Sequence, residues 1–189
     1  MSATNGKFIQ NGTLTFNKFG QNGETIGQVI AWNGSLWAPV TPGYELILTA
    51  TQQTTSNAYA SVTGLITPTL AVGYYRWKVT ALAQSTVANT GVGVRISNVT
   101  AVVGVCYGRW QISQAIDGTA KAFQYDQLTS TTNVTSASVQ TINTDLVVLG
   151  EGVVQVTTAG TVAVQLRSET NGNQVSLRNG TLFRLEPIG

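Results

Sequence analysis

Tyr74-Tyr75-Arg76-Trp77-Lys78-Val79-Thr80-Ala81-Leu82-Ala83 is the stretch that decides the fold class of this chain. Successive side chains of a β-strand point to opposite faces of a sheet. Alternate positions here put four aromatic and aliphatic residues on one face: Tyr75, Trp77, Val79 and Ala81. The other face carries Arg76, Lys78 and Thr80. The pattern predicts a β-strand with its apolar face turned toward a core.

The rest of the chain repeats this alternation between Asn-Gly, other glycine and proline turn signals, and no segment keeps the apolar period of a helix. We therefore predict an all-β chain. Residues 44–189 are enough for one antiparallel sandwich or jelly roll with a full core. The expected strands are Tyr44–Ala50, Ala58–Val62, Tyr74–Gln84, Val92–Asn98, Val102–Gln114, Phe123–Leu128, Ser138–Leu149, Val153–Thr158, Thr161–Arg167, Gln174–Leu177 and Thr181–Leu185.

The expected strands leave two breaks near the C-terminus. Gly150-Glu151-Gly152 separates the expected strand that ends at Leu149 from the one that begins at Val153. Ala159-Gly160 lies between two stretches of alternating valines, which is typical of a short hairpin connection.

The expected strand Val102–Gln114 is apolar on both faces. Val103, Val105 and Tyr107 fall on one face, and Val102, Cys106, Trp110 and Ile112 fall on the other. A strand of this kind can be buried in its own core and against a second surface, which indicates oligomerisation. The alternative is a central strand whose outer face is covered by loops.

Residues 1–43 differ in composition from the rest of the chain. They contain four Asn-Gly steps, and their apolar residues are sparse and mostly aromatic. A segment this short and this poor in apolar side chains does not form its own core. We predict an N-terminal arm or stalk that becomes ordered against another surface. The expected attachment residues are Phe8, Ile9, Phe16, Phe19, Trp32 and Trp37.

Within this arm, residues 27–40 predict a β-hairpin. Asn33-Gly34 favours a two-residue type I′ turn, which would pair Trp32 with Ser35 and Ile30 with Trp37. A lone hairpin is only marginally stable in water, so its aromatic face must dock elsewhere. The alternatives are the body of the protein, other copies of it, or a foreign ligand such as a sugar ring.

The composition excludes several classes of function. The chain has 10 Lys and Arg, 8 Asp and Glu, no His and one Cys, and its formal net charge is +2. The lack of His removes His-based acid–base catalysis and His metal ligands, and one Cys cannot form an intrachain disulfide or a Cys-rich zinc site. No basic cluster points to nucleic acid, and no apolar run or signal pattern points to a membrane. We expect no enzymatic activity, catalytic residues, metal or cofactor, although distant carboxylates can be paired by a fold.

Several motifs together resemble tailed-phage virion proteins. The segment Gly-Gln-Val-Ile-Ala-Trp-Asn-Gly-Ser-Leu-Trp-Ala-Pro, residues 27–39, resembles a short module of their fibres and spikes. Residues 67–77, Thr-Pro-Thr-Leu-Ala-Val-Gly-Tyr-Tyr-Arg-Trp, resemble the entry strand of their trimeric jelly-roll domains, which are similar to tumour necrosis factor. Residues 150–156 and 159–167 resemble the paired late strands, and residues 180–185 resemble the closing strand.

The resemblance implies a homotrimeric virion protein, assembled in the host cytoplasm. We expect a capsid decoration, cement or head-fibre protein whose partner is the major capsid protein or another virion protein. The alternative is a tail-fibre or baseplate tip that binds host cell-surface glycan through loops such as Asn171–Gln174. The residues expected in the trimer interface or the core are Tyr75, Trp77, Val154, Val156, Val162, Val164, Phe183 and Leu185.

Overall fold

The computed structural model describes residues 43–114, 139 and 141–188, together with the backbone of residues 29–32, 37–40 and 121–127. The chain divides into two compact units, Met1–Pro42 and Gly43–Gly189. All the regular elements of the described part are β-strands, as the sequence predicts. This part of the chain contains no helix, and hence none that could cross a membrane.

The smaller unit contains one antiparallel hairpin, formed by β1 (Val29–Trp32) and β2 (Trp37–Val40). Its register puts Trp32 directly opposite Trp37. The predicted two-residue turn is therefore wrong, because four residues separate the strands; longer hairpin connections of this length are also common. The expected attachment residues Phe8, Ile9, Phe16 and Phe19 lie outside the described residues, as do the side chains of Trp32 and Trp37.

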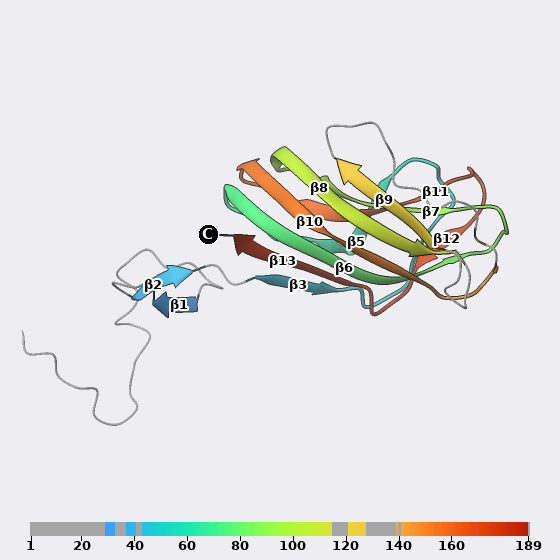
Figure 1. The fold of residues 1–189 in the computed structure, drawn as a ribbon, viewed down its shortest axis with the longest axis horizontal. Helices are drawn as coiled ribbons and strands as arrows, with labels where there is room; N and C mark the ends of the chain where they lie inside the picture. The colour runs from blue at the N-terminus through green and yellow to red at the C-terminus, as the bar shows by residue number, and fades with distance from the viewer. Residues whose placement is uncertain are drawn as a thin grey trace, which may run out of the picture. The chain divides into compact units, whose positions relative to one another are not determined.

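The larger unit consists of two antiparallel sheets, with the smaller sheet behind the larger one in Figure 1. The large sheet has the order β3-β13-β6-β10-β8-β9. Strand β13 pairs with residues 74–80 of β6, and the short strand β12 pairs with residues 83–85 of β6 and with β4. The small sheet has the order β5-β11-β7. The strands are β3 (Tyr44–Ile47), β4 (Gln52–Thr54), β5 (Ala60–Ile66), β6 (Gly73–Ser85), β7 (Val92–Asn98), β8 (Val102–Ser113), β9 (Lys121–Gln127), β10 (Leu146–Thr158), β11 (Val162–Ser168), β12 (Val175–Leu177) and β13 (Leu182–Ile188).

The two sheets enclose one hydrophobic core. Strand β6 crosses the middle of the large sheet, and its predicted inner residues are all buried, while Arg76, Lys78 and Thr80 are exposed. The indoles of Trp77 and Trp110 lie at the centre, with ring centroids 5.2 Å apart. The core also contains every residue predicted for the core or the trimer interface, namely Tyr75, Trp77, Val154, Val156, Val162, Val164, Phe183 and Leu185.

Two predicted features of the late strands are wrong, and both involve glycines. Gly150 and Gly152 do not end a strand but lie inside the continuous strand β10. A Cβ on Gly150 would collide with the Trp110 ring. A Cβ on Gly152 would collide with the Tyr107 carbonyl of β8 and lie 2.7 Å from Cζ2 of Trp77. These glycines therefore make room for the core tryptophans and for the backbone of the neighbouring strand.

Ala159-Gly160 is not a hairpin connection, because β10 and β11 belong to different sheets. Gly160 instead pairs with Leu70, whose N–H donates to the Gly160 carbonyl at 2.7 Å. A Cβ on Gly160 would lie 2.6 Å from Cα of Ala101. Glycine is therefore required where the chain crosses between the sheets against another backbone segment.

Candidate interaction face

The outer face of the large sheet, turned away from the core, is organised in rows across the strands. Antiparallel pairing aligns one residue of each strand with one residue of the next, and aligned residues share a face. The first row contains Ile188, Tyr74, Gln155 and Val105. The second contains Glu186, Arg76, Val153 and Tyr107. The third contains Glu45, Arg184, Lys78, Glu151 and Arg109.

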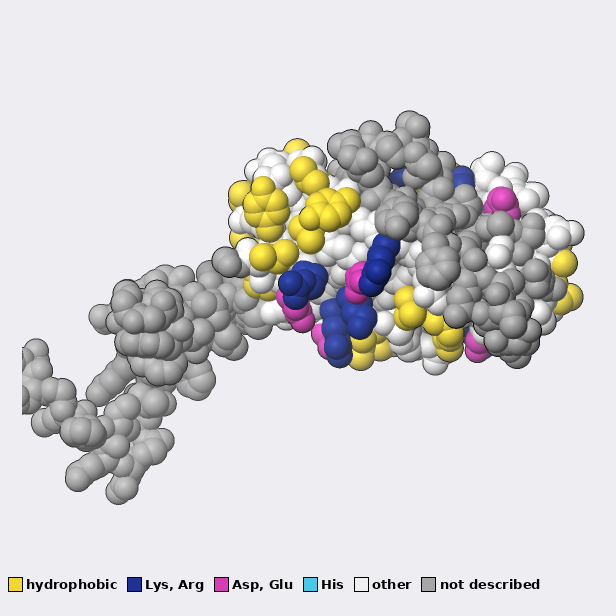
Figure 2. Space-filling model, in the orientation of Figure 1, with side chains coloured by type: hydrophobic (Ala, Val, Ile, Leu, Met, Phe, Trp, Pro, Cys, Tyr) yellow, Lys and Arg dark blue, Asp and Glu magenta, His cyan; other side chains and the backbone are white. Residues whose placement is uncertain are grey.

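One end of this face is apolar and exposed. We call it the apolar end and define it by Tyr74, Val102, Val105, Tyr107 and Ile188, whose exposures are 50%, 53%, 42%, 52% and 43%. Figure 2 shows hydrophobic side chains gathered at one end of the face, beside a group of basic and acidic ones. Exposed apolar side chains clustered in this way are typical of a surface that binds another protein.

Strand β8 has two apolar faces, as the sequence predicts: Cys106, Trp110 and Ile112 are buried in the core, while Val105 and Tyr107 face solvent. The predicted list of site residues named inward-facing positions and missed these outward ones. The double pattern of β8 was the sequence signal that could have identified Tyr107.

The sides predicted for the first two residues of β8 are wrong, because Val102 is exposed and Val103 packs against the core. The pairing register with β10 shifts at this end of the strand, which breaks the simple alternation.

Next to the apolar end lies a charged band, which is the third row described above. The Arg184 Nε donates to Oε2 of Glu45 at 2.6 Å, and the Arg109 Nε donates to Oε1 of Glu151 at 2.8 Å. Lys78 lies between these pairs, opposite Arg184 on one side and Glu151 on the other. It forms no ion pair with any described residue. All these side chains are exposed, so each pair contributes about 0–1 kcal/mol to stability.

An open hollow of about 330 Å³ lies beside the charged band. It is lined by Lys78, Thr80, Arg109, Trp110, Gln111, Leu149, Gly150 and Glu151. The side chains of Lys78, Thr80 and Gln111 make no hydrogen bond within the part of the chain that the structure describes. The hollow therefore presents donors and acceptors that no described side chain occupies.

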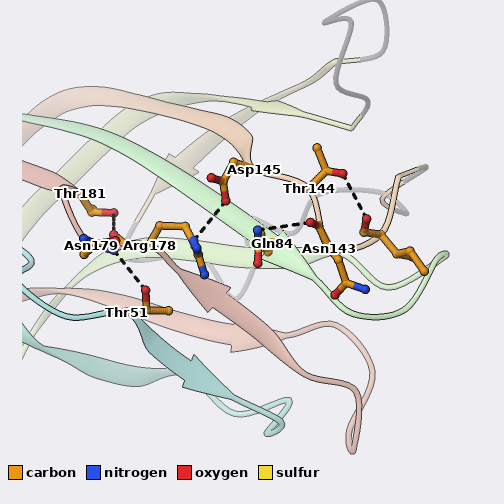
Figure 3. Close-up of polar contacts among 9 residues, drawn as sticks. Thr51, Gln84, Asn143, Thr144, Asp145, Arg178, Asn179 and Thr181 are labelled. Carbon is orange, nitrogen blue, oxygen red and sulfur yellow. Dashed lines mark hydrogen bonds and ion pairs between the residues drawn. The ribbon is translucent and has the colours of Figure 1, made fainter.

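Polar contacts at the other end of the unit hold turns together (Figure 3). Arg178 pairs with Asp145 at 3.2 Å, and the Gln84 side chain donates to the Asn143 carbonyl at 3.4 Å. The Thr181 hydroxyl donates to the carbonyl of Arg178 at 2.7 Å. All three contacts join parts of the larger unit to one another, which indicates a structural role for the cluster.

Two further expected or notable positions have structural roles. In the predicted glycan-binding loop Asn171–Gln174, the Asn173 amide already donates to the Thr90 hydroxyl at 2.7 Å. The Tyr75 hydroxyl donates to the carbonyl of Ala71 at 2.9 Å. Burial, together with the nearby Tyr44, raises the pKa of Tyr75 above its ordinary value of 10.0.

Among the described residues, no three His, Cys, Asp or Glu side chains are grouped so that they could hold a metal ion.

Comparison with known proteins leaves the family open. No protein-family model matches the chain, and no curated protein matches it. One solved structure, described as "Structure of infectious bursal disease virus Gx strain", is similar over 85% of this chain with 12% identity and a TM-score of 0.20. The match covers 46% of that viral chain, so this protein spans about half its length.

Proposed function

We propose that this protein is a structural component of a tailed-phage virion, a homotrimeric decoration protein that packs on the head. The observation that carries the proposal is the apolar end of the large sheet. Tyr74, Tyr107 and Ile188 are each about half exposed there, next to the charged band. Tyrosine-rich apolar surface with a charged rim is typical of protein–protein interfaces.

The pairing of the strands supports a jelly roll. In an eight-stranded jelly roll the first strand pairs with the last, the last with the third, and the third with the sixth. If β8 and β9 together are counted as the fifth strand, then β3, β6, β10 and β13 are the first, third, sixth and eighth strands. The pairs β3–β13, β13–β6 and β6–β10 then follow the jelly-roll order. In the second sheet, β5–β11 and β11–β7 follow it as well. The departure is β8, which pairs with β10 and not with β7.

The apolar end is the surface that we assign to contacts between the three copies. The eight residues expected in the core or the interface are buried within one subunit, so they are not accessible to a neighbour. The solvent-facing side of β8 supplies the second burial surface that the sequence pattern indicates. The five residues that define this end carry no charge, which limits the desolvation cost of association.

Residues 1–42 are assigned to attachment on the virus particle, because their apolar residues are few and mostly aromatic. Binding only to the assembled shell would stabilise the shell by mass action. This assignment rests on the resemblance of the sequence to phage fibre and spike modules.

The subunit contacts are tested by the mass of the purified protein in solution. Light scattering should give the mass of a trimer for the purified protein. Tyr107→Arg should reduce this mass to that of a monomer, because it places a charge in the apolar end. Gln53→Arg adds the same charge at an exposed position of β4 and should leave the trimer intact. A monomeric parent protein, or a trimeric Tyr107→Arg variant, contradicts the assignment.

Attachment is tested by co-sedimentation with emptied particles of the virus that encodes the chain, and with intact host cells. Sedimentation with particles and not with cells is the expected result. Replacing Trp32 and Trp37 with Ala should abolish it without changing the far-ultraviolet circular dichroism. Binding to cells alone would favour a receptor-binding tip.

A further inference from the structure

The hollow beside the charged band has the features of a small binding site. Its volume of about 330 Å³ lies at the lower end of the range for ligand pockets. Lys78, Thr80 and Gln111 line it from β6 and β8, and their side chains have no hydrogen-bond partner among the described residues. Convergent polar groups without internal partners are what a polar ligand requires.

The charge of the hollow is positive because of how the band is paired. Glu151 is held by Arg109, and the other carboxylate of the row, Glu45, is held by Arg184. Lys78, between them, is left without a carboxylate partner in the described part of the chain. A ligand carrying one negative charge would complete the row.

The remaining surface of the hollow suits a sugar ring. Leu149 is 38% exposed and offers an apolar surface for the C–H groups of a ring. The Thr80 hydroxyl and the Gln111 amide both donate and accept hydrogen bonds, as sugar hydroxyl groups do. The carboxylate of Glu151 adds a further acceptor on the same wall.

We propose that this hollow binds a single acidic sugar unit, a hydroxyl-rich ring that carries one carboxylate. Lys78 pairs with the carboxylate, Thr80 and Gln111 bind hydroxyl groups, and Leu149 contacts the ring. The site goes beyond the proposed structural function and does not depend on it, since none of its lining residues belongs to the apolar end.

Titration calorimetry of the full-length protein with three probes tests the ligand class. D-glucuronate supplies both the ring and the carboxylate, D-glucose only the ring, and acetate only the carboxylate. Millimolar binding of glucuronate, at least tenfold tighter than either of the others, is expected. Equal binding of acetate and glucuronate would reduce the hollow to an anion site and overturn the proposal, as would no binding of glucuronate.

Variants test the location of the site. Lys78→Met should weaken glucuronate binding about tenfold, since a charge-assisted hydrogen bond is lost. Thr80→Val should weaken it several-fold, and it also serves if the first variant does not fold. Arg76→Met removes a cation of the neighbouring row and should leave binding unchanged. Unchanged binding in Lys78→Met and Thr80→Val would overturn the proposal. Light scattering on every variant separates this result from a failure of the trimer.

Discussion

Replacing Gly108 with Ala tests the packing of the core tryptophans on the large sheet. A Cβ at this position would collide with Cζ2 of Trp77, lie 2.7 Å from its Cη2 and lie 2.6 Å from the Glu151 carbonyl oxygen. The first neighbour is a rigid ring in the core and the second is backbone of the adjacent strand. Neither can move away without displacing other packed groups.

Gly104 on the same strand provides a matched control. A Cβ there would lie 2.8 Å from Oε1 of Gln155, the end of a side chain that can rotate away, and 2.8 Å from Cγ2 of Thr157, an exposed side chain outside the core. Both Gly→Ala changes reduce the entropy of the unfolded chain by the same amount, about 0.4–1 kcal/mol of stabilisation where no strain results. The difference between the two variants therefore isolates the collision.

Overpacking a core costs about 1–3 kcal/mol, and we expect Gly108→Ala to reach about 3 kcal/mol because both obstacles are fixed. In a domain of this size that lowers the melting temperature by about 6–12 °C. Thermal and urea unfolding would be followed by tryptophan fluorescence at one fixed protein concentration, since association adds to stability. Gly104→Ala should melt close to the parent protein. If Gly108→Ala and Gly104→Ala had the same melting temperature, the packing described for Trp77 would be refuted.

Three further substitutions have expected outcomes. Trp110→Phe should cost only about 1–2 kcal/mol in urea unfolding, because the buried indole N–H it removes has no acceptor among the described residues; a loss as large as that of Trp110→Ala would contradict this. Tyr75 stays protonated in the folded state at pH values where the unfolded chain ionises, so stability should fall as pH rises above 10.0. Tyr75→Phe should make that alkaline fall shallower, and an identical pH profile would disprove it. Glu45→Gln breaks an exposed pair with Arg184 and should change the unfolding free energy by less than about 1 kcal/mol; a larger loss would show that the pair is more than a surface contact.

The sequence was most informative where apolar and polar residues alternate. The period of two identified the buried face of β6, and Val92–Asn98 matches β7 at both ends. Strand β4 was not expected, because Gln52-Gln53-Thr54 has no apolar alternation and is held by pairing with the distant β12. Tertiary pairing of this kind leaves no local signal.

Glycine was the main source of error. Local reasoning left Gly150 and Gly152 outside the expected strands and assigned Gly160 to a hairpin connection, whereas all three lie where a ring or another backbone approaches closely. Those neighbours come from distant parts of the sequence, so a local pattern cannot reveal them. The apolar end could be predicted in part, from the double-faced pattern of β8. The hollow could not be, because it depends on which side chains the strand register brings together.

The pairing of β3 with β13 has a consequence for how the protein is made. These strands are the first and last of the larger unit, so the large sheet cannot be completed until Leu182–Ile188 has been synthesised. Strand β6, which carries Trp77, is made early and must wait for β13 on one side and β10 on the other. Until then its apolar face and both its edges are open to pairing with other chains. Alternating Arg76, Lys78 and Thr80 with the apolar residues keeps charge on the strand during that interval and protects the nascent chain from aggregation.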